Sequence, residues 1–403
     1  MMKSAQEALS LILDSARTLS AEDVALSESL HRILSESVTA PINLPPFDNS
    51  AMDGFAIAGE SDSFQVIGTI AAGDRSLSKI RPGEAIRIMT GAPIPNGTYA
   101  VVPFEEWPIT KPILPGTHIR RAGEDVSAGS RLFDAGEKIT PRTIALLAAL
   151  GLDRFRVFRK PRVAILSTGS ELVEMGTPLR PGQIYNSNGP AIAAALKEMG
   201  IEARTIGVAA DTEDALKGRI QDSPLQEIDV LLTVGGVSAG DFDLVPKVLK
   251  DLGADIIFHK VSIKPGKPLL YATLVGAGSP RPGAETAPLQ IFGLPGNPVS
   301  ALMVFDRFVR PALLKMMGAE KILRTPHEAV AAEPMKGAVG KEVYLRGVVT
   351  SENGRFVARS AGAQGSAMLR SLARANAVLI VPASKLGIAA GESLSFEFLE
   401  EGL

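Results

Sequence analysis

The sequence of 403 residues contains no cysteine. This absence excludes disulfide bonds, thiolate catalysis and any zinc or iron–sulfur centre held by cysteine. The four histidines, His31, His118, His259 and His327, are far apart in the chain and form no closely spaced pair, so a histidine metal site is not expected. Any bound metal ion is therefore expected to be a hard cation held by oxygen atoms.

The chain also lacks a long apolar run and a strong excess of charge. No stretch approaches the roughly 20 apolar residues that span a bilayer. The N-terminal MMKSAQEALSLILDSARTL has the pattern of an amphipathic helix and no signal-peptide cleavage site. The formal net charge of −2 gives no general attraction to nucleic acid. We therefore expect a cytoplasmic protein that binds neither membranes nor nucleic acid.

Helix and strand patterns in the first part of the chain predict a domain with an insertion. Ser4 with Glu7 resembles a capping box that opens an amphipathic helix, and Thr140-Pro141 opens a later helix. Segments such as FQVIGTI, AIRIMTG and YAVVPFEEW indicate a small β module between them. We predict an elongated helical/mixed domain from residues 1–40 and 139–160, in which residues 21–40 are helical or mixed. The inserted β module spans residues 41–138.

The rest of the chain predicts two further domains, within the roughly two to four that its length allows. Short apolar strands such as RVAILST and DVLLTV alternate with helices such as PAIAAALKEMG, a pattern typical of a mainly parallel α/β sandwich. This core domain is predicted for residues 161–322, and its tract 275–288 is expected to be a long surface hairpin or flexible loop. The segments EVYLRGVV, RFVARS, AVLIVP and SLSFEFLE predict a small C-terminal β barrel over residues 323–403.

Four polar loops of the α/β domain are candidates for ligand binding. They are STGSEL (167–172), TVGGVSAGDFD (233–243), SIKPGKP (262–268) and GLPGNPVSA (293–301). Loops that follow parallel strands gather at one edge of the sheet, where ligands bind. Gly235 and Gly236 would let the backbone approach a ligand, and Asp241 and Asp243 could hold a divalent cation. The alternative is an ordinary turn from strand to helix.

Two of these loops suggest anion binding. In KPGKP, Pro265 and Gly266 force a turn that aims Lys264 and Lys267 together, and an anion such as phosphate would relieve their repulsion. The alternative is a solvated hairpin. In GLPGNP, the predicted cap of the next helix also offers N–H groups to an anion.

Glu171 also allows two interpretations. It either complements a helix dipole or, together with Asp211 and Asp243, holds Mg²⁺ against phosphate oxygens.

Nine motifs in order resemble the MoeA family, the molybdopterin molybdenumtransferases, which include the gephyrin E domain. They are PFDNSAMDGFA (46–56), RIMTGAPIPNGTYAVV (87–102), IRRAGEDV (119–126), STGSEL, GQIYNSN (182–188), GGVSAGDFD, KPGKP, GLPGNPVSA and QGSAMLRSLARANAVLIVP (364–382). These motifs cover nearly the whole chain. The resemblance implies the last step of molybdenum cofactor synthesis. In that step adenylylated molybdopterin and molybdate are the substrates, the adenylate is hydrolysed with release of AMP, and molybdenum enters the dithiolene.

The resemblance also implies partners, a cofactor and site residues. It implies Mg²⁺ as cofactor, a homodimer with its active site between the α/β domain of one subunit and the β module of the other, and a transient contact with the molybdopterin adenylyltransferase. The implied catalytic residues are Asp53, Glu171, Asp211, Lys260 and Lys264. The implied substrate-binding residues are Thr90, Asp125, Ser167, Thr168, Gly235, Gly236, Ser238, Lys267, Pro295, Gly296, Asn297 and Pro298. The implied metal ligands are Glu171, Asp211 and Asp243.

The sequence departs from the family pattern at two positions. Ser170 stands where the family usually has aspartate, and Val234 stands where serine or threonine is common, so altered affinity is an open alternative. A second alternative is a non-catalytic scaffold of the gephyrin E-domain type. A third is a paralogue that favours tungstate, because the choice of oxyanion depends on small differences in pocket size and charge.

Overall fold

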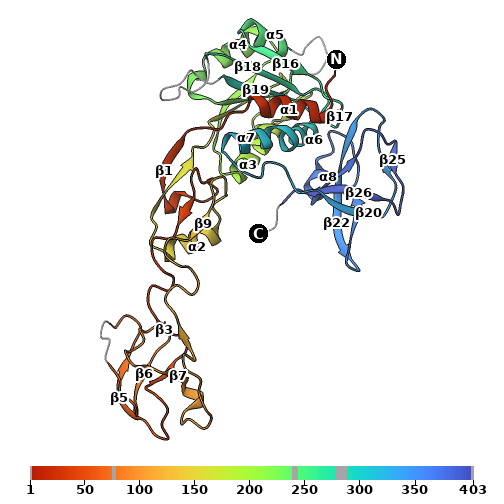
Figure 1. Cartoon of the computed structure of the whole chain (residues 1–403). Coiled ribbons are helices and arrows are strands. Elements are labelled where there is room, and N and C mark those ends of the chain that lie inside the picture. Colours follow the sequence, from red (N-terminus) through yellow and green to blue (C-terminus); the bar gives the residue numbers. More distant parts are fainter. Residues whose placement is uncertain (1, 75–78, 238–243, 277–287, 401–403) are drawn as a thin grey trace.

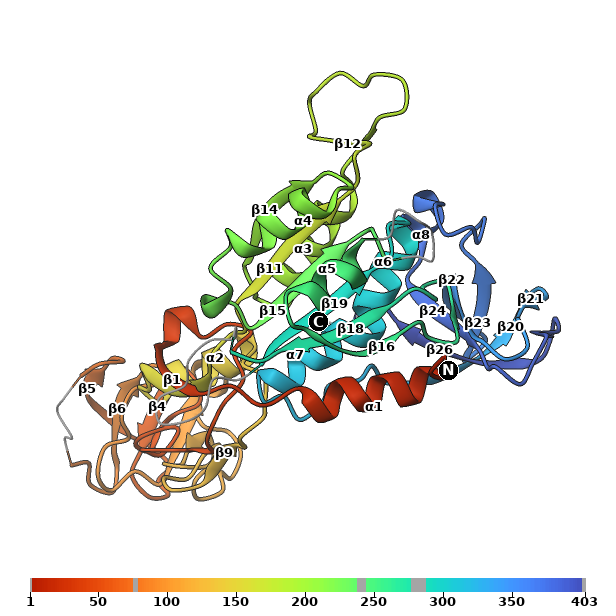
Figure 2. The ribbon, with the colours of Figure 1, turned by 90° about the horizontal axis from the view of Figure 1, so that it is seen from above.

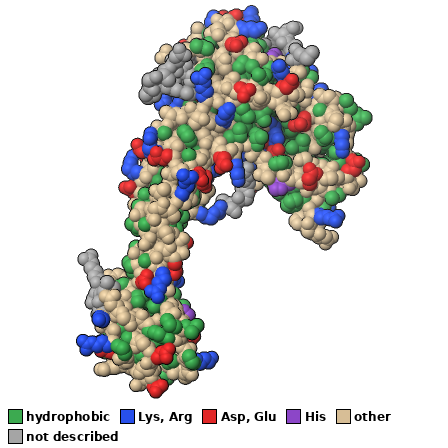
Figure 3. Space-filling model, in the orientation of Figure 1, with side chains coloured by type: hydrophobic (Ala, Val, Ile, Leu, Met, Phe, Trp, Pro, Cys, Tyr) green, Lys and Arg blue, Asp and Glu red, His purple; other side chains and the backbone are tan. Residues whose placement is uncertain are grey.

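The computed structural model describes residues 2–74, 79–237, 244–276 and 288–400. Figure 1 shows an elongated molecule in which the α/β domain and the C-terminal barrel lie side by side, while a narrow unit leads from the α/β domain to the β module at the far end. Figure 3 shows the same separation on the molecular surface. Among the described helices, none has both the length and the apolar character that a membrane span requires.

A six-stranded sheet in the order β14-β11-β15-β19-β18-β16 forms the centre of the α/β domain. Its strands are β11 (Val163–Thr168), β14 (Ala203–Ala209), β15 (Val230–Val234), β16 (Asp255–His259), β18 (Leu270–Leu274) and β19 (Leu289–Leu294). Only β18 runs against the direction of its neighbours. Every residue of β11, β15 and β19 is buried, as their continuous apolar sequences require. The predicted mainly parallel sheet is confirmed. Most of the predicted loop 275–288, between β18 and β19, lies outside the described residues.

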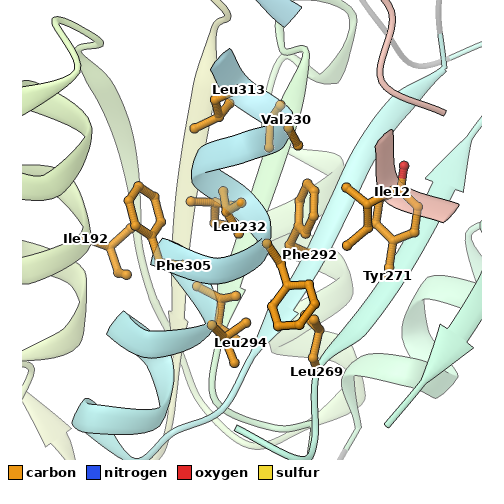
Figure 4. Packing of buried hydrophobic residues seen from close by; sticks show 14 of the residues in the cluster. Ile12, Ile192, Val230, Leu232, Leu269, Tyr271, Phe292, Leu294, Phe305 and Leu313 are labelled. Atoms are coloured by element: carbon orange, nitrogen blue, oxygen red, sulfur yellow. The ribbon is translucent and has the colours of Figure 1, made fainter. Parts of the chain in front are cut away.

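Helices cover both faces of this sheet, as Figure 2 shows. They are α3 (Asn188–Glu198), α4 (Glu213–Gln221), α5 (Val245–Asp251), α6 (Pro298–Val304), the π-helical turn η4 (Phe305–Val309) and α7 (Arg310–Met316). The domain also holds η3 (Leu225–Glu227), β12 (Leu172–Val173) and β13 (Ile184–Tyr185). On one face, Leu232 and Phe292 of the sheet pack with Phe305 and Leu313 of the covering helices (Figure 4). A separate core with α4 and α5 forms on the other face.

The first helix, α1 (Ala5–Ser15), packs on the α/β domain. Its capping box is confirmed, because Glu7 N donates to Ser4 Oγ at 3.2 Å and Ser4 N donates to Glu7 Oε2 at 2.8 Å. The buried Ile12 lies beside Tyr271 of the sheet (Figure 4). The prediction that this helix belongs to the elongated domain is therefore wrong. Periodicity indicates which face of a helix is buried, but it does not indicate the surface that covers it.

The elongated domain consists of two segments that the β module separates in sequence. Its elements are β1 (Ala21–Ala25), η1 (Leu26–Glu28), β2 (Val38–Thr39), β9 (Arg131–Phe133), α2 (Pro141–Ala149) and β10 (Arg154–Phe158). β1 pairs antiparallel with β10, and β2 with β9, so the two segments share hydrogen-bonded ladders. Thr140 caps α2 as predicted, its hydroxyl accepting from Thr143 N at 3.2 Å. Residues 21–40 are strand and turn, without an α-helix.

The β module holds a four-stranded sheet in the order β5-β6-β4-β7, beside the short pair β3–β8. Its elements are β3 (Asn49–Ser50), β4 (Gly54–Ile57), β5 (Gln65–Ile70), β6 (Glu84–Ile88), β7 (Ala100–Pro103), η2 (Phe104–Glu106) and β8 (Ile119–Arg120). At Gly54 a methyl group would lie 2.0 Å from Val102 O, so glycine is needed for the close approach of β4 and β7.

The C-terminal domain is a closed five-stranded barrel, as predicted, because β24 pairs with both β26 and β22. Its elements are β20 (His327–Ala331), β21 (Met335–Lys336), β22 (Glu342–Glu352), β23 (Arg355–Ser360), α8 (Leu369–Arg374), β24 (Ala377–Val381), β25 (Gly387–Ile388) and β26 (Ser393–Phe398). One further strand, β17 (Ile263–Lys264), comes from the α/β domain and pairs parallel with β22.

Candidate functional site

The loops that follow β11, β14, β15 and β19 meet at the carboxyl edge of the sheet. Gly169 N donates to Ala209 O at 3.1 Å, and Gly235 N donates to Leu294 O at 2.9 Å. Asn188 Nδ2, at the start of α3, donates to Gly296 O at 2.6 Å. These hydrogen bonds place the STGSEL, GGV and GLPGNP loops in one cluster, as the parallel sheet predicts.

The two glycines after β15 are required by their backbone geometry. Gly235 has φ +104° and Gly236 has φ +64°, values that side chains rarely allow. A methyl group on Gly235 would lie 2.5 Å from Thr168 O and 2.6 Å from its Oγ1. The loop therefore passes directly over the end of β11. The predicted residues Ser238 and Asp243, together with Asp241, lie outside the described residues.

The predicted Ser167 and Thr168 are almost fully buried, with 1% and 7% of their surface exposed. Ser167 Oγ accepts a hydrogen bond from Asn186 Nδ2 at 3.0 Å, and Gly189 N donates to Asn186 Oδ1 at 3.1 Å. Ser167 thus connects β11 to the start of α3 through Asn186. This contact gives Ser167 a structural part in holding the loop.

Two of the three predicted metal ligands lie on neighbouring loops. Asp211 Oδ2 accepts from Ser170 N at 2.9 Å, and Ser170 Oγ accepts from Asp211 N at 2.9 Å. The Glu171 carboxylate is exposed and has no hydrogen-bond donor within the described part of the chain. Ser170 therefore orients Asp211 on the loop next to the one that carries Glu171. Exposed carboxylate oxygens are suitable donors for Mg²⁺. The described residues contain no group of three acidic or histidine side chains close enough to hold a metal, so a complete ligand set would need a further oxygen donor.

The lysine turn, which we define as residues 260–267, lies between the α/β domain and the barrel. Lys260 has φ +91°, an uncommon value for a side-chain-bearing residue, and its N–H donates to Leu269 O at 2.8 Å. Lys264 and Lys267 are exposed. Gly266 has φ +106°, and a methyl group there would lie 2.5 Å from Val304 Cγ2 of α6. The turn is thus fixed against α6 while two of its lysines face solvent.

Two residues that the sequence interpretation missed hold this edge in place. His259 Nε2 lies 2.7 Å from Val237 O, which fixes the backbone just after the paired glycines. Arg346 is 1% exposed and donates to the carbonyls of residues 363, 364 and 365. In the next residue of that loop, Ser366 O accepts from Val299 N of α6 at 3.1 Å. The barrel therefore contacts the GLPGNPVSA loop. The QGSAML motif was the available signal for this contact.

A second group of predicted residues lies on the β module. Asp53 Oδ1 accepts from Thr90 N at 2.7 Å and from Thr90 Oγ1 at 2.8 Å. The Thr90 N–H, and after it the Thr90 hydroxyl, lower the pKa of Asp53 below its ordinary value of 3.8. Asp125 is exposed on a neighbouring loop, where its N–H donates to Leu44 O at 3.1 Å.

The structure does not bring these two groups together within one chain. Figure 1 shows the β module and the α/β domain at opposite ends of the elongated unit. Asp53, Thr90 and Asp125 therefore lie far from the carboxyl edge of the sheet. Any site that uses both groups needs the module of a second molecule.

Three family models match successive parts of the chain. The "MoeA N-terminal region (domain I and II)" matches residues 3–151, the "Probable molybdopterin binding domain" matches residues 164–315, and the "MoeA C-terminal region (domain IV)" matches residues 328–399.

Full-length proteins resemble the chain in sequence and in structure. It is 37% identical to "Molybdopterin molybdenumtransferase 2" of Mycobacterium tuberculosis over 98% of both chains. It is 35% identical to the molybdopterin molybdenumtransferase of Haemophilus influenzae, over 96% of this chain and 98% of that protein. The crystal structure of the "molybdopterin biosynthesis moea protein" from Pyrococcus horikosii superposes with a TM-score of 0.78 at 30% identity and full coverage of both chains.

Proposed function

The chain belongs to the MoeA family, and on this premise we propose that it is a molybdopterin molybdenumtransferase acting in molybdenum cofactor biosynthesis. Its substrates would be adenylylated molybdopterin and molybdate, with AMP released on hydrolysis of the adenylate. The observation that carries the proposal is the cluster of loops after β11, β14, β15 and β19. In this cluster the glycines leave the backbone open to a ligand, and the same edge carries exposed acidic and basic side chains.

Each group of the cluster has a part in this reaction. The lysine turn offers exposed ammonium groups to phosphate or molybdate oxygens, which form charge-assisted hydrogen bonds. Glu171 and Asp211 would hold Mg²⁺, which supplies charge stabilisation at the phosphate oxygens. The glycines after β15 have no side chains to cover the backbone, so that their amide groups can contact the ligand.

We further propose that the protein acts as a homodimer, with the β module of one subunit facing the carboxyl edge of the other. The supporting observation is that Asp53 and Lys264 lie at opposite ends of the molecule (Figure 1). A cytoplasmic location and a transient contact with the molybdopterin adenylyltransferase, which would supply the adenylylated substrate, belong to the same proposal.

The test is a mass-resolved assay of adenylylated molybdopterin consumption, run with molybdate and with tungstate. We expect AMP and the molybdenum-containing cofactor with molybdate. A faster reaction with tungstate would identify a tungstate-selective paralogue, and no consumption with either oxyanion would favour a scaffold protein. Chelation should stop AMP release and added Mg²⁺ should restore it. Undiminished hydrolysis after chelation would contradict the proposed part of Glu171 and Asp211.

A further inference from the structure

A cavity opens at the opposite, amino-terminal edge of the parallel sheet, away from the loop cluster. It has a volume of about 860 Å³ and lies where the elongated domain meets the α/β domain. Its walls include Val163 at the start of β11, Ile228 just before β15 and Gly200 just after α3. None of the predicted site residues lines this cavity. A ligand bound here would be separated from the carboxyl edge by the length of the strands.

Basic side chains outnumber acidic ones around this cavity. The basic lining residues are Lys160, Arg162, Lys197 and Arg204, and the acidic ones are Glu202 and Glu227. Arg204 and Glu227 are 4.0 Å apart and both highly exposed, so this pair contributes little. The remaining side chains carry three positive charges and one negative charge. Figure 3 shows basic and acidic side chains gathered where the two domains meet. The cavity therefore attracts anions.

Lys160 is the most enclosed of these cations. Burial, and after it the nearby Arg32, lower the pKa of its ammonium group. Glu202 and Glu22 oppose this shift by attraction at a distance, but within the described residues the Lys160 Nζ forms no hydrogen bond or ion pair. The neighbouring cations differ, because Arg159 is bound by both oxygens of Asp229 and Arg32 by Glu22. A partly buried ammonium group without a hydrogen-bonded partner is costly, and an anion in contact with Nζ would supply one.

A glycine next to Lys160 leaves space beside its ammonium group. Gly200 has φ +74°, and a methyl group there would lie 3.2 Å from His31 Cβ and 3.5 Å from Lys160 Nζ. His31 itself has φ +64°, which is uncommon for a residue with a side chain. Burial, and after it Lys138 and Lys160, lower the pKa of His31, so its ring is neutral at neutral pH and adds no charge.

We propose that this cavity binds a small dianionic phosphate group, carried by free phosphate or by a nucleoside monophosphate, with Lys160 as the inner contact and Arg162 and Lys197 as outer contacts. The volume leaves room for a nucleoside beside the phosphate. Because His31 and Lys160 belong to the elongated domain and Lys197 belongs to the α/β domain, the bound anion joins the two domains. The site is additional to the one at the carboxyl edge.

The test is isothermal titration calorimetry at low ionic strength. The full-length protein is titrated with inorganic phosphate and, separately, with AMP. The parent protein carries Lys264→Ala, which removes the predicted phosphate contact of the lysine turn. Adding Lys160→Met should weaken binding about tenfold or more, since it removes one charge-assisted hydrogen bond. Adding Lys250→Met, at the exposed end of α5, is the matched control and should leave the affinity unchanged. Arg162→Gln, on the rim, should weaken binding about threefold.

Comparison of the two probes identifies the ligand. Tighter binding of AMP than of phosphate indicates a nucleotide site, whereas equal affinities indicate a site for phosphate alone. Unchanged affinity in Lys160→Met, or no binding of either probe at millimolar concentration, overturns the proposal. If phosphate does not bind and Lys160→Met instead weakens self-association in sedimentation, the cavity is an interface between two copies and the proposal is wrong.

Two further measurements separate a loss of phosphate binding from a loss of stability and from a loss of catalytic activity. Arg162→Gln lies on the surface, so it tests the site even if Lys160→Met lowers stability. Turnover of adenylylated molybdopterin by the single variant Lys160→Met should stay at the wild-type rate, because Lys160 lies outside the carboxyl-edge site. Loss of phosphate binding with retained turnover therefore separates this inference from the proposed function.

Discussion

The β module and the carboxyl edge of the α/β sheet hold their acidic residues in different ways. In the module, Asp53 already receives two hydrogen bonds from Thr90. At the carboxyl edge, Asp211 accepts one hydrogen bond, from Ser170 N, while the Glu171 carboxylate has no donor within the described part of the chain and Lys264 faces solvent. In the module the acidic group is therefore prearranged by both the backbone and the side chain of Thr90, while the carboxyl edge has a fixed backbone and leaves Glu171 and Lys264 without partners among the described residues. This difference suggests that the module orients the ligand and that the carboxyl edge supplies charge.

The largest expected effect comes from placing a defective β module on one chain and a defective carboxyl edge on the other chain of a dimer. Asp53→Ala and Lys264→Ala should each lose about nine-tenths or more of the activity at substrate concentrations below KM, because each removes a contact from every site. In a mixed population about half of the dimers are heterodimers, each with one intact site, so activity should recover to about a quarter of wild type. The measurement is turnover after co-refolding of the two variants. Activity of a mixture no higher than that of either variant alone would contradict the composite site.

At the carboxyl edge, Lys264→Ala should weaken binding of adenylylated molybdopterin or molybdate by about 1.5–3 kcal/mol, which is tenfold or more. The melting temperature should stay nearly unchanged, because an exposed lysine contributes little to folding. Calorimetric titration and thermal melts of the same variant give both quantities, with Lys250→Ala as the exposed control. Wild-type affinity would support the solvated-hairpin alternative and remove the lysine turn from the site.

The fixed backbone of the carboxyl edge can be tested at His259. His259→Ala removes the group that holds Val237 O and should raise KM for adenylylated molybdopterin about two- to tenfold, the effect of one ordinary hydrogen bond. His259→Gln keeps a donor at this position and should restore most of the affinity. Steady-state kinetics should show the change in KM with kcat much less affected. If the glutamine variant is as impaired as the alanine variant, the hydrogen bond does not position the loop.

The smallest expected effect concerns the hydrogen bonds between Thr90 and Asp53 in the β module. Thr90→Val removes the hydroxyl donor and keeps the N–H, so the pKa of Asp53 should rise but stay below 3.8. A carboxyl whose pKa is lowered on folding stabilises the protein above its unfolded pKa, and this stabilisation is lost as pH falls through the folded value. The wild type should therefore lose more stability than Thr90→Val below pH 3.8. Carboxyl NMR titration of Asp53 measures the shift, and an identical pKa in both proteins would contradict it.

The sequence predicted the α/β sheet because its strands are continuous apolar runs that alternate with helices. It also predicted which loops meet, since the ends of parallel strands share one edge. The place of α1 was wrong, because an amphipathic pattern does not identify the surface that the helix covers.

The side chains that hold the site were harder to find. The sequence did not show that Ser167 is buried and hydrogen-bonded to Asn186. Arg346 looked like an ordinary barrel residue, yet it binds three carbonyls of a distant loop. His31 and Lys160 approach Gly200 only through long-range packing. Such contacts depend on tertiary distances, which residue spacing alone does not contain.

The shared strand pairing between β17 and β22 has a consequence for how the protein unfolds. Ile263 and Lys264 belong to the α/β domain by sequence but pair with Glu342 and Val343 of the barrel. Denaturing the barrel must therefore break hydrogen bonds that also shape the lysine turn. Calorimetry should show the two domains melting in one cooperative transition. A substitution that unfolds the barrel would then weaken anion binding even though every lysine of the turn is still present.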